Sequence, residues 1–473
     1  MNDMIKKISD NIWEIEKEGG MNVPGRVFAS DVLMEKIRQD KTIEQVKNVA
    51  CLPGIVKYSI ACPDAHQGYG FSVGAVAAFD AKKGIISPGG IGFDINCGVR
   101  IIRTGIDKKD FLKKRKEILT EICRKIPAGV GEKSEFRLSD KEINEVLEKG
   151  VGWAVEKNYA TKEDIEMTED NGCIIGASAR EVSQKAKGRG KNQLGTLGSG
   201  NHFLEMQEVE SIFDEKIANL FGLKKGHVVI MIHSGSRGLG HQIASDYIQA
   251  MEKEYGFAHL PDRQLAYAPI NSKLGEKYLS AMAAAANFAF VNRQLMTYQV
   301  RKVFEKFFPK NKLELVYDIT HNIAKFEDFE INGKKQTLCV HRKGATRSFG
   351  AGRKEIPLLY RKAGQPIFLP GSMGTFSYVL VGNEKAAEIS FSSTAHGAGR
   401  VLSRSYAVKN ISPEKIQKEL DKYDVMIKAG SRKGIVEEAP EAYKDVNEVA
   451  RVSDALGIGN LVARLKPLAV IKG

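Results

Sequence analysis

The stretch VIMIHSGSRGLGHQ, residues 229–242, joins a strand-like apolar run to a Gly-rich turn and then to a helical pattern. The same order of strand, glycine turn and helix occurs at the phosphate loop of dinucleotide-binding βαβ units. Here, however, the glycines do not follow the GxGxxG order, no βαβ unit surrounds them, and the sequence contains no GxxxxGK[ST] loop. The stretch therefore argues against a doubly wound nucleotide-binding sheet.

Strand-like and helical segments follow one another irregularly along the rest of the chain. Apolar and alternating runs predict strands over residues 71–79, 97–104, 202–209, 227–233, 313–319 and 377–382. Helical periodicity predicts helices over 108–125, 139–157, about 275–308, from Ser412-Pro413 onward and over 440–455. Ser139 and Glu142 have the spacing of a capping box. Because no regular βαβ rhythm is present, the sequence predicts the α+β class.

The sequence also predicts how the domain is organised. No linker, low-complexity tract or internal repeat divides it. We therefore expect one large mixed domain over residues 1–473, with helical insertions near 106–158 and 241–308. Its sheets are expected to carry the functional site at their strand ends, with the helices at the periphery.

Composition restricts the class of protein and of partner. The 473 residues are 42% apolar and 27% charged, which is ordinary for a globular chain. The formal charge of 71 − 58 = +13 favours a polyanionic partner such as nucleic acid, although a basic surface also serves solubility alone. Six cysteines without a CxxC pair, no signal peptide and no apolar stretch long enough for a bilayer predict a cytoplasmic protein with no membrane partner.

Metal-type ligands occur where predicted strands begin or end. The stretches GFDINCGVR (92–100), GSGNHFLE (198–205), VIMIHSGSRGLGHQ and YDITHNIAK (317–325) contain the candidates Asp94, Cys97, His202, His233 and His321. Each residue taken singly is more often structural, but all share a strand edge and most a neighbouring glycine. Five ligands exceed the four of a structural zinc site. They suit two metal ions that share a bridging ligand, and the thiolate of Cys97 is the natural bridge.

Three Gly-rich turns, at 233–240, 369–374 and 395–400, offer backbone N–H groups to anionic oxygens. The last turn carries His396 among Ser, Thr, Ala and Gly, so that a ligand can come close to the imidazole.

Basic residues cluster at 108–116, 185–193 and 341–354. The first cluster is typical of the solvated face of a helix. The third interleaves Arg and Lys with Gly, Ser and Phe349, which favours contacts to RNA or DNA phosphates through residues such as Arg342, Lys343 and Arg347.

An ordered set of motifs resembles the RtcB family of RNA-splicing ligases. These are FDINCGVR, GSGNHFLE, HSGSRGLG, THN, HRKGATR, PGSMG, HGAGR and the C-terminal AVIKG, found in this order from about residue 20 to the last residue. The resemblance implies an enzyme that joins an RNA 2′,3′-cyclic phosphate or 3′-phosphate end to a 5′-hydroxyl, with GTP and two Mn²⁺ ions. It implies RNA as the partner, tRNA halves in particular, an archease protein as a possible activator, and a monomer.

The same resemblance assigns roles to residues. Asp94, Cys97 and His202 would hold one manganese, and Cys97, His233 and His321 the second, while His396 would carry GMP. The implied guanylate pocket consists of Asn201, His202, Phe203, Leu204, Glu205, His321, Asn322, Pro370, Gly371, Ser372, Met373, Ser377, His396, Gly397, Ala398, Gly399 and Lys472. Asp64 and His66, in the motif PDAHQGYG, are interpreted as groups that orient other ligands, and Arg237 as a contact to an RNA phosphate.

Two other functions fit parts of the pattern. The ligand set alone allows a two-metal phosphoesterase that acts on RNA ends without nucleotide transfer. The basic charge alone allows an RNA-binding protein without catalysis. Retention of label from GTP separates the ligase from the first, and loss of RNA sealing after Cys97→Ala separates it from the second.

Overall fold

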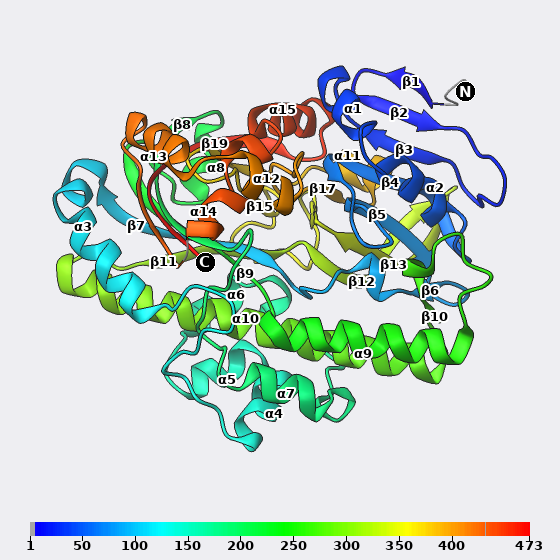
Figure 1. The fold of residues 1–473 in the computed structure, drawn as a ribbon, viewed down its shortest axis with the longest axis horizontal. Helices are drawn as coiled ribbons and strands as arrows, with labels where there is room; N and C mark the ends of the chain where they lie inside the picture. Colours follow the sequence, from blue (N-terminus) through cyan, green and yellow to red (C-terminus); the bar gives the residue numbers. More distant parts are fainter. Residues whose placement is uncertain (1–4, 431) are drawn as a thin grey trace.

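Two large β-sheets organise the chain in this computed structural model, which describes residues 5–430 and 432–473 (Figure 1). Helices pack around both sheets, and the mixture of helices with largely antiparallel strands confirms the α+β class. Among the named strands only β3–β4 and β18–β19 pair in parallel, which explains why the sequence has no βαβ rhythm.

The eight-stranded sheet holds most of the strands predicted from the sequence. Its order is β11-β7-β9-β8-β19-β16-β15, with β18 added beside β19. The bounds are β11 (Glu314–Thr320), β7 (Gly98–Asp107), β9 (His227–Ser234), β8 (Phe203–Ile212), β19 (Asn460–Lys472), β16 (Ser377–Val381), β15 (Pro366–Leu369) and β18 (Met426–Ala429). The strands over 97–104, 202–209, 227–233, 313–319 and 377–382 are thereby confirmed.

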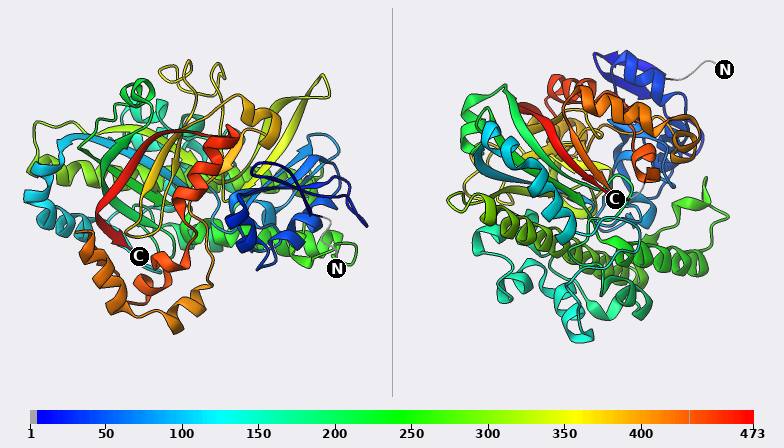
Figure 2. Two further views of the ribbon diagram at one scale, coloured as in Figure 1. Left: turned by 90° about the horizontal axis from the view of Figure 1, so that it is seen from above. Right: turned by 60° about the vertical axis from the view of Figure 1, so that its left-hand side comes forward.

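The seven-stranded sheet is built mainly by the N-terminal part of the chain, as Figure 2 shows in blue. Its strands, in order, are β1 (Ile5–Ser9), β2 (Ile12–Ile15), β3 (Gly25–Phe28), β4 (Ile55–His66), β5 (Val73–Asp80), β13 (Lys334–Lys343) and β12 (Asn322–Ile331). Two small ladders complete the strand pairing, β6 (Ile85–Ile86) with β10 (Ala268–Pro269) and β14 (Ala345–Arg347) with β17 (Ser393–Ala395).

The helices begin where the sequence supplies capping residues. Ser139 and Glu142 form the predicted capping box of α4, and Pro413 occupies the first turn of α13. The helices are α1 (Asp31–Ile37), α2 (Thr42–Ala50), α3 (Lys108–Lys125), α4 (Asp140–Lys149), α5 (Val151–Glu156), α6 (Lys162–Glu166), α7 (Gln184–Gly190), α8 (Glu215–Leu220), α9 (Arg237–Tyr255), α10 (Lys273–Phe307), α11 (Lys385–Ser390), α12 (Arg404–Asn410), α13 (Pro413–Lys422), α14 (Arg432–Glu437) and α15 (Val446–Leu456).

Helix α10 differs from the peripheral position that the sequence predicts for the helices. Every residue from 281 to 297 is buried, because α10 packs against β9 on one side and against α4, α5 and α9 on others. Figure 1 shows α9 and α10 lying below the sheets, with α4, α5 and α7 beneath them. A buried helix of this length lets polar side chains reach the sheet from below. No helix of the described residues is long and apolar enough to cross a membrane.

Candidate metal centre and nucleotide-transfer site

The five candidate ligands come together at one edge of the eight-stranded sheet. Cys97 and His202 directly precede β7 and β8, His233 lies at the end of β9, and His321 separates β11 from β12. β9 pairs antiparallel with both β7 and β8, and β11 pairs antiparallel with β7. The first residues of β7 and β8 therefore lie beside the last residues of β9 and β11.

The ligand atoms form two groups of three that share Cys97. Asp94, Cys97 and His202 make one group, Cys97, His233 and His321 the other, and within each group the atoms lie within 4.8 Å of one another. Cys97 Sγ is 3.4 Å from His202 Nε2 and 3.2 Å from His233 Nε2. His202 Nε2 lies 2.8 Å from Asp94 Oδ2, and the Nε2 atoms of His233 and His321 are 3.3 Å apart.

Local backbone geometry aims these ligands. Asn96 adopts a left-handed conformation (φ 54°), and its side chain donates to Ala286 O on α10 at 2.7 Å. This turn directs Cys97 toward the histidines. Ser236 donates its backbone N–H to Asp94 Oδ1 at 3.0 Å, and the preceding Gly235 is so close that a Cβ there would collide with the Asp94 carboxylate.

Arg293 on α10 holds two of the ligand loops from below. Its guanidinium donates to Asn96 O at 2.8 Å and to Ser234 O at 2.9 Å, the carbonyls next to Cys97 and His233. Two further bonds, at 2.8 and 2.7 Å, tie it to the carboxylate of Asp318 in β11. Since Arg293 and Asp318 are both fully buried, this clamp is rigid and well shielded from water.

Burial sets the protonation of the ligands. It lowers the pKa of His233 and His321 well below the usual range, so both rings are neutral and can offer lone pairs. Although burial alone raises the pKa of Asp94, the neighbouring His202 and Arg237 hold it well below its usual range. Burial, reinforced by Asp94, raises the pKa of the Cys97 thiol, a preference that a bound divalent cation reverses.

The donor set fits divalent metal ions. A thiol, a carboxylate and three imidazoles converge with their lone-pair atoms facing one another, as in the Nε2–Nε2 approach of His233 and His321. A proton can bridge one pair of these lone-pair atoms, whereas a cation bound between the donors can accept lone pairs from several of them at once. The shared thiol lets one side chain belong to both groups.

His396 stands beside this cluster and is oriented by Asp64. Its ring centroid is 4.7 Å from that of His321. Asp64 Oδ2 lies 2.5 Å from His396 Nδ1 and accepts the backbone N–H of His396 at 3.0 Å. The carboxylate therefore favours the tautomer with the proton on Nδ1, which leaves the lone pair on Nε2. Gly399 is required here, because its φ is +73° and a Cβ would collide with Asp64 O.

A basic cavity of about 750 Å³ opens onto the cluster. Its lining includes five arginines or lysines but only one acidic residue, Asp94, so its potential suits a polyanion. The predicted residues that line it are His66, Asp94, Cys97, Asn201, His202, His233, Arg237, His321, Asn322, Lys343, His396 and Gly399. Those that do not line it are Asp64, Phe203, Leu204, Glu205, Arg342, Arg347, Pro370, Gly371, Ser372, Met373, Ser377, Gly397, Ala398 and Lys472.

Several of the latter residues form a buried polar network behind the cavity. Lys472 Nζ lies 5.4 Å from the centroid of the Phe203 ring and 3.7 Å from Glu438 Oε2. Gln207 donates to Glu205 Oε2 at 2.7 Å and to Ser377 Oγ at 3.0 Å. Burial raises the pKa of the Glu205 carboxyl to about 7.

The remaining predicted pocket residues belong to two loops that touch. Ser377 Oγ accepts the backbone N–H of Gly371 at 3.2 Å, and Pro370 O accepts that of Ala398 at 3.1 Å. Ser372 and Met373 follow in the first loop and are buried, and Gly397 lies against Pro370 O. The loops at 370–373 and 396–399 are thus brought together.

Leu204 belongs to the implied guanylate pocket, but its side chain points away from Phe203 and Glu205. Alternation along β8 places Phe203 and Glu205 on one face of the sheet and Leu204 on the other, where it packs with Ile232 and Ile471. The backbone of Leu204 pairs with Ile232 of β9 and Ile471 of β19.

Glu438 and Tyr443 belong to the site but have no motif signal. Glu438 is fully buried and forms ion pairs with Arg400, Arg404 and Lys472. Tyr443 hydrogen-bonds to Glu438 and donates to Asn201 Oδ1 at 3.3 Å. In the sequence, the acidic run around Glu438 resembles a solvated surface segment, so only the tertiary structure reveals that Glu438 is a buried partner of basic residues.

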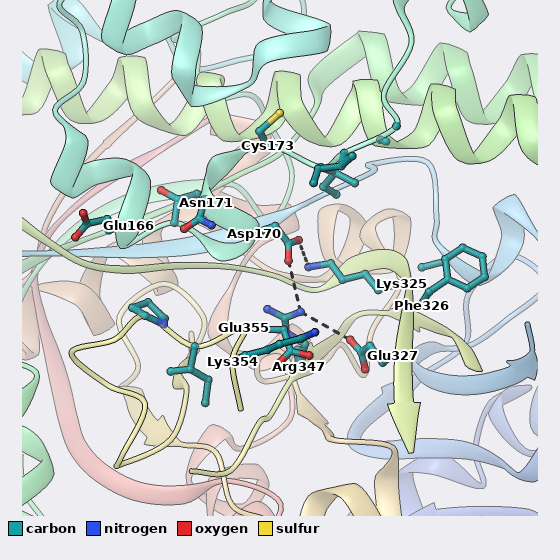
Figure 3. Close-up of a pocket in the computed structure, with 18 of the residues that line it drawn as sticks. Glu166, Asp170, Asn171, Cys173, Lys325, Phe326, Glu327, Arg347, Lys354 and Glu355 are labelled. Carbon is teal, nitrogen blue, oxygen red and sulfur yellow. Dashed lines mark hydrogen bonds and ion pairs between the residues drawn. The ribbon is translucent and has the colours of Figure 1, made fainter. Parts of the chain in front are cut away.

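The structure does not bring Arg342 and Arg347 to the surface on which the sequence predicts phosphate contacts, because both side chains are buried and face carboxylates. Arg342 is fully buried and donates two bonds, at 2.8 and 2.7 Å, to Glu327. Arg347 points toward Asp170 and Glu327 in the wall of a separate cavity (Figure 3). That cavity is lined by five acidic and four basic residues, so it lacks the positive potential that a polyanion needs.

Lys343, the third predicted residue of this cluster, does line the basic cavity. Its ammonium donates to the carbonyls of Tyr69 at 2.5 Å and Phe71 at 2.7 Å. Burial lowers its pKa to about 7. Arg237 reaches the same cavity and lies 3.4 Å from His202 Nδ1 through its Nη1.

In this α+β protein, strand ends bring a Cys/His/Asp ligand cluster together beside an imidazole and a basic cavity. The model of the family described as tRNA-splicing ligase RtcB matches residues 45–473. The chain therefore belongs to the RtcB family, and the resemblance of its motifs is confirmed.

Relatives match over nearly their whole length. The tRNA-splicing ligase RtcB of Nanoarchaeum equitans is 52% identical over 478 residues, with 100% of both chains covered. That of Thermococcus kodakarensis is 51% identical over 477 residues, with 99% of each covered. RNA-splicing ligase RtcB homolog 1 of Entamoeba histolytica is 45% identical over 484 residues, which cover 98% of this chain and 92% of the relative.

Proposed function

We propose that this protein is a GTP- and Mn²⁺-dependent RNA ligase that joins RNA 3′-phosphate or 2′,3′-cyclic phosphate ends to 5′-hydroxyl ends. The observation that carries the proposal is the position of His396, oriented by Asp64 at 2.5 Å and adjacent to the ligand cluster in one basic cavity. Family membership supports it, since the relatives are named tRNA-splicing ligases.

His396 is the nucleophile toward GTP. Its Nε2 attacks the α-phosphorus, a P–N bond forms, and the bond from the α-phosphorus to the bridging oxygen breaks as pyrophosphate leaves. The ring then carries a positive charge, and the Asp64 carboxylate at Nδ1 stabilises it. A lysine nucleophile would require a strongly lowered pKa, whereas a neutral imidazole has a lone pair available at physiological pH.

Two further displacements complete the reaction. An oxygen of the RNA 3′-phosphate attacks the phosphorus of the histidine-bound GMP, the P–N bond breaks, and His396 returns to its neutral form. The 5′-hydroxyl oxygen then attacks the activated 3′-phosphorus, GMP leaves as a phosphate anion, and the hydroxyl proton passes to solvent. A cyclic phosphate is opened by water to a 3′-phosphate before these steps.

Asp94, Cys97 and His202 would hold one Mn²⁺, and Cys97, His233 and His321 the second. When bound, the ions supply charge stabilisation for phosphoryl oxygens that develop negative charge. Imidazole and carboxylate donors suit manganese, while a bridging thiolate is less usual for it.

The buried network beside the cavity is the proposed guanine subsite. Glu205 and Lys472 can read the polar edge of the base, and Phe203 can pack against its ring. Glu438 neutralises Lys472 when the subsite is empty, because their charged atoms lie 3.7 Å apart. The loops at 370–373 and 396–399 would supply backbone amides for the α-phosphate.

Labelled GTP tests the proposal. Incubation with α-³²P-GTP and Mn²⁺ is expected to leave acid-labile, base-stable label on the protein and to yield joined RNA from 3′-phosphate and 5′-hydroxyl strands. His396→Ala should abolish both while Mn²⁺ binding persists, whereas His227→Ala, at the opposite end of β9, should retain both. Release of phosphate from RNA ends without protein labelling would instead indicate a phosphoesterase.

A further inference from the structure

A stacked pair of aromatic rings lies on the wall of the basic cavity and has no part in the chemistry above. The ring centroids of Phe93 and His241 are 4.9 Å apart with an interplanar angle of 25°. Tyr69 supports Phe93 from its edge, at 5.2 Å and 66°. Phe93 and Tyr69 are half-buried and pack against the core, whereas His241, near the start of α9, is exposed. The outer ring of the stack therefore presents a face to solvent.

Positively charged groups line the same cavity as this stack. Phe93, His241, Arg189 and Arg237 all line the cavity that contains the ligand cluster. The Arg189 guanidinium is close enough to contribute, after burial, to lowering the pKa of His241, and it donates to Gln242 on α9 at 3.1 Å. An exposed ring in a cavity that also contains arginines is an arrangement with which proteins bind single-stranded nucleic acid, because bases stack on the ring while phosphates pair with the arginines.

We propose that His241, backed by Phe93, is a stacking platform for the nucleobase of a nucleotide at the RNA end to be sealed. The inference rests on the proposed RNA-ligase function. The platform would accept any base, since every base has a flat π-face, and it would fix the position of the terminal nucleotide relative to His396. His241 is thus a positioning residue, and Arg189 would bind the phosphate next to the stacked base.

The position of His241 suits base stacking better than core packing. Phe93 and Tyr69 already fill the space on the inner side of the stack, so the His241 ring adds no packing to the core and lies on its outer side. Phe93 directly precedes the ligand Asp94, so a base held on this stack lies next to the loop that carries a metal ligand. The platform thereby couples RNA placement to the reacting end.

Abasic substrates provide the test. RNA strands with a 3′-phosphate or a 5′-hydroxyl are prepared with a normal or an abasic terminal nucleotide, and their dissociation constants are measured for the wild type, His241→Ala and His241→Tyr. For the wild type, loss of the base on one of the two strands is expected to weaken binding roughly 10-fold. The strand that shows the effect identifies which end the platform holds.

The variants decide the outcome. In His241→Ala the abasic and normal strands should bind equally, while His241→Tyr should restore the difference, since a tyrosine ring also stacks. A terminal 2-aminopurine should be quenched by the wild type and by His241→Tyr but not by His241→Ala. His259→Ala, another exposed histidine beside an aromatic ring but outside the cavity lining, is the matched control and should behave as wild type.

Equal effects of the abasic site in wild type and His241→Ala, or no effect in either, would overturn the platform. Labelling of His396 by GTP is measured in parallel and should be unchanged in His241→Ala. Labelling of His396 needs no RNA. A wild-type protein that takes up no label from GTP would therefore refute the proposed ligase chemistry, whereas the RNA-binding measurements test the platform alone.

Discussion

Replacing Arg293 by Met tests whether helix α10 holds the metal ligands in place. The guanidinium makes five bonds, two to Asp318, two to Asn96 and one to Ser234 O. Removing them leaves two buried backbone carbonyls without these donors, at about 1–3 kcal/mol each. The expected loss of unfolding free energy is about 3–5 kcal/mol, the usual range for breaking a buried ion pair. Freed from this support, the ligand loops should bind Mn²⁺ about 10- to 100-fold more weakly.

Arg100→Met is the matched control. Arg100 is equally buried and donates to the same Asp318 carboxylate at 2.7 Å, but its other bonds go to Gln294 and Thr297 rather than to a ligand loop. Both variants remove one positive charge from the Asp318 cluster, but only Arg293 is close enough to the ligands to contribute to lowering the pKa of Cys97, His233 and His321.

Urea unfolding of the metal-free proteins and calorimetric titration with Mn²⁺ separate the two effects. Both variants should lose comparable stability, whereas only Arg293→Met should lose metal affinity beyond the change seen in Arg100→Met. Equal Mn²⁺ affinities in the two variants would refute the idea that Arg293 positions the ligands.

Three further predictions concern other parts of the site. Asp64→Asn should slow labelling of His396 by about 10²- to 10⁴-fold, measured by α-³²P-GTP, because the tautomer is no longer fixed, while Mn²⁺ binding is retained. Burial raises the pKa of Glu205 to about 7 from an unfolded value near 4.5, so the folded state binds this proton more tightly than the unfolded state. The free energy of unfolding should therefore fall as pH rises from about 4.5 to about 7. In Glu205→Gln this fall should be smaller by roughly 3 kcal/mol at most, as measured by urea unfolding. Arg342→Met should lower stability by about 3–5 kcal/mol without changing the salt dependence of RNA binding, whereas Arg189→Ala should reduce the salt slope by about 1, as measured by filter binding.

The metal ligands could be predicted because each stands beside a strand end. Cys97, His202, His233 and His321 each adjoin a recognisable strand, and antiparallel pairing then forces these ends together. Local sequence and sheet geometry agree here, so the motif order leads directly to the cluster.

Other parts could not be read locally. Arg342 and Arg347 lie in a segment whose sequence resembles a phosphate-binding surface. Their burial becomes apparent only from the carboxylates that oppose them, Glu327 and Asp170, which are distant from one another in the sequence. Glu438 similarly acquires its partners from α12 and the end of β19. Burial of charge is a tertiary property, because it depends on which segments oppose it.

The hairpin between β12 and β13 has a local turn signal in its sequence. Asn332 (φ 51°) and Gly333 (φ 74°) form the turn between β12 and β13, and both residues are suited to positive φ. The polar, exposed tip of this hairpin has weak hydrophobic alternation, which hid strands that complete the seven-stranded sheet beside His321.

The number of Mn²⁺ ions bound per chain, with and without the Cys97 thiol, shows whether two ions share this ligand beside His396. Equilibrium dialysis should give about two ions for the wild type, about one for Asp94→Ala, and fewer than one for Cys97→Ala, because that thiol belongs to both groups of ligands. If Cys97→Ala still bound one ion with unchanged affinity, the two sites would not share this ligand and the dinuclear centre beside His396 would be contradicted.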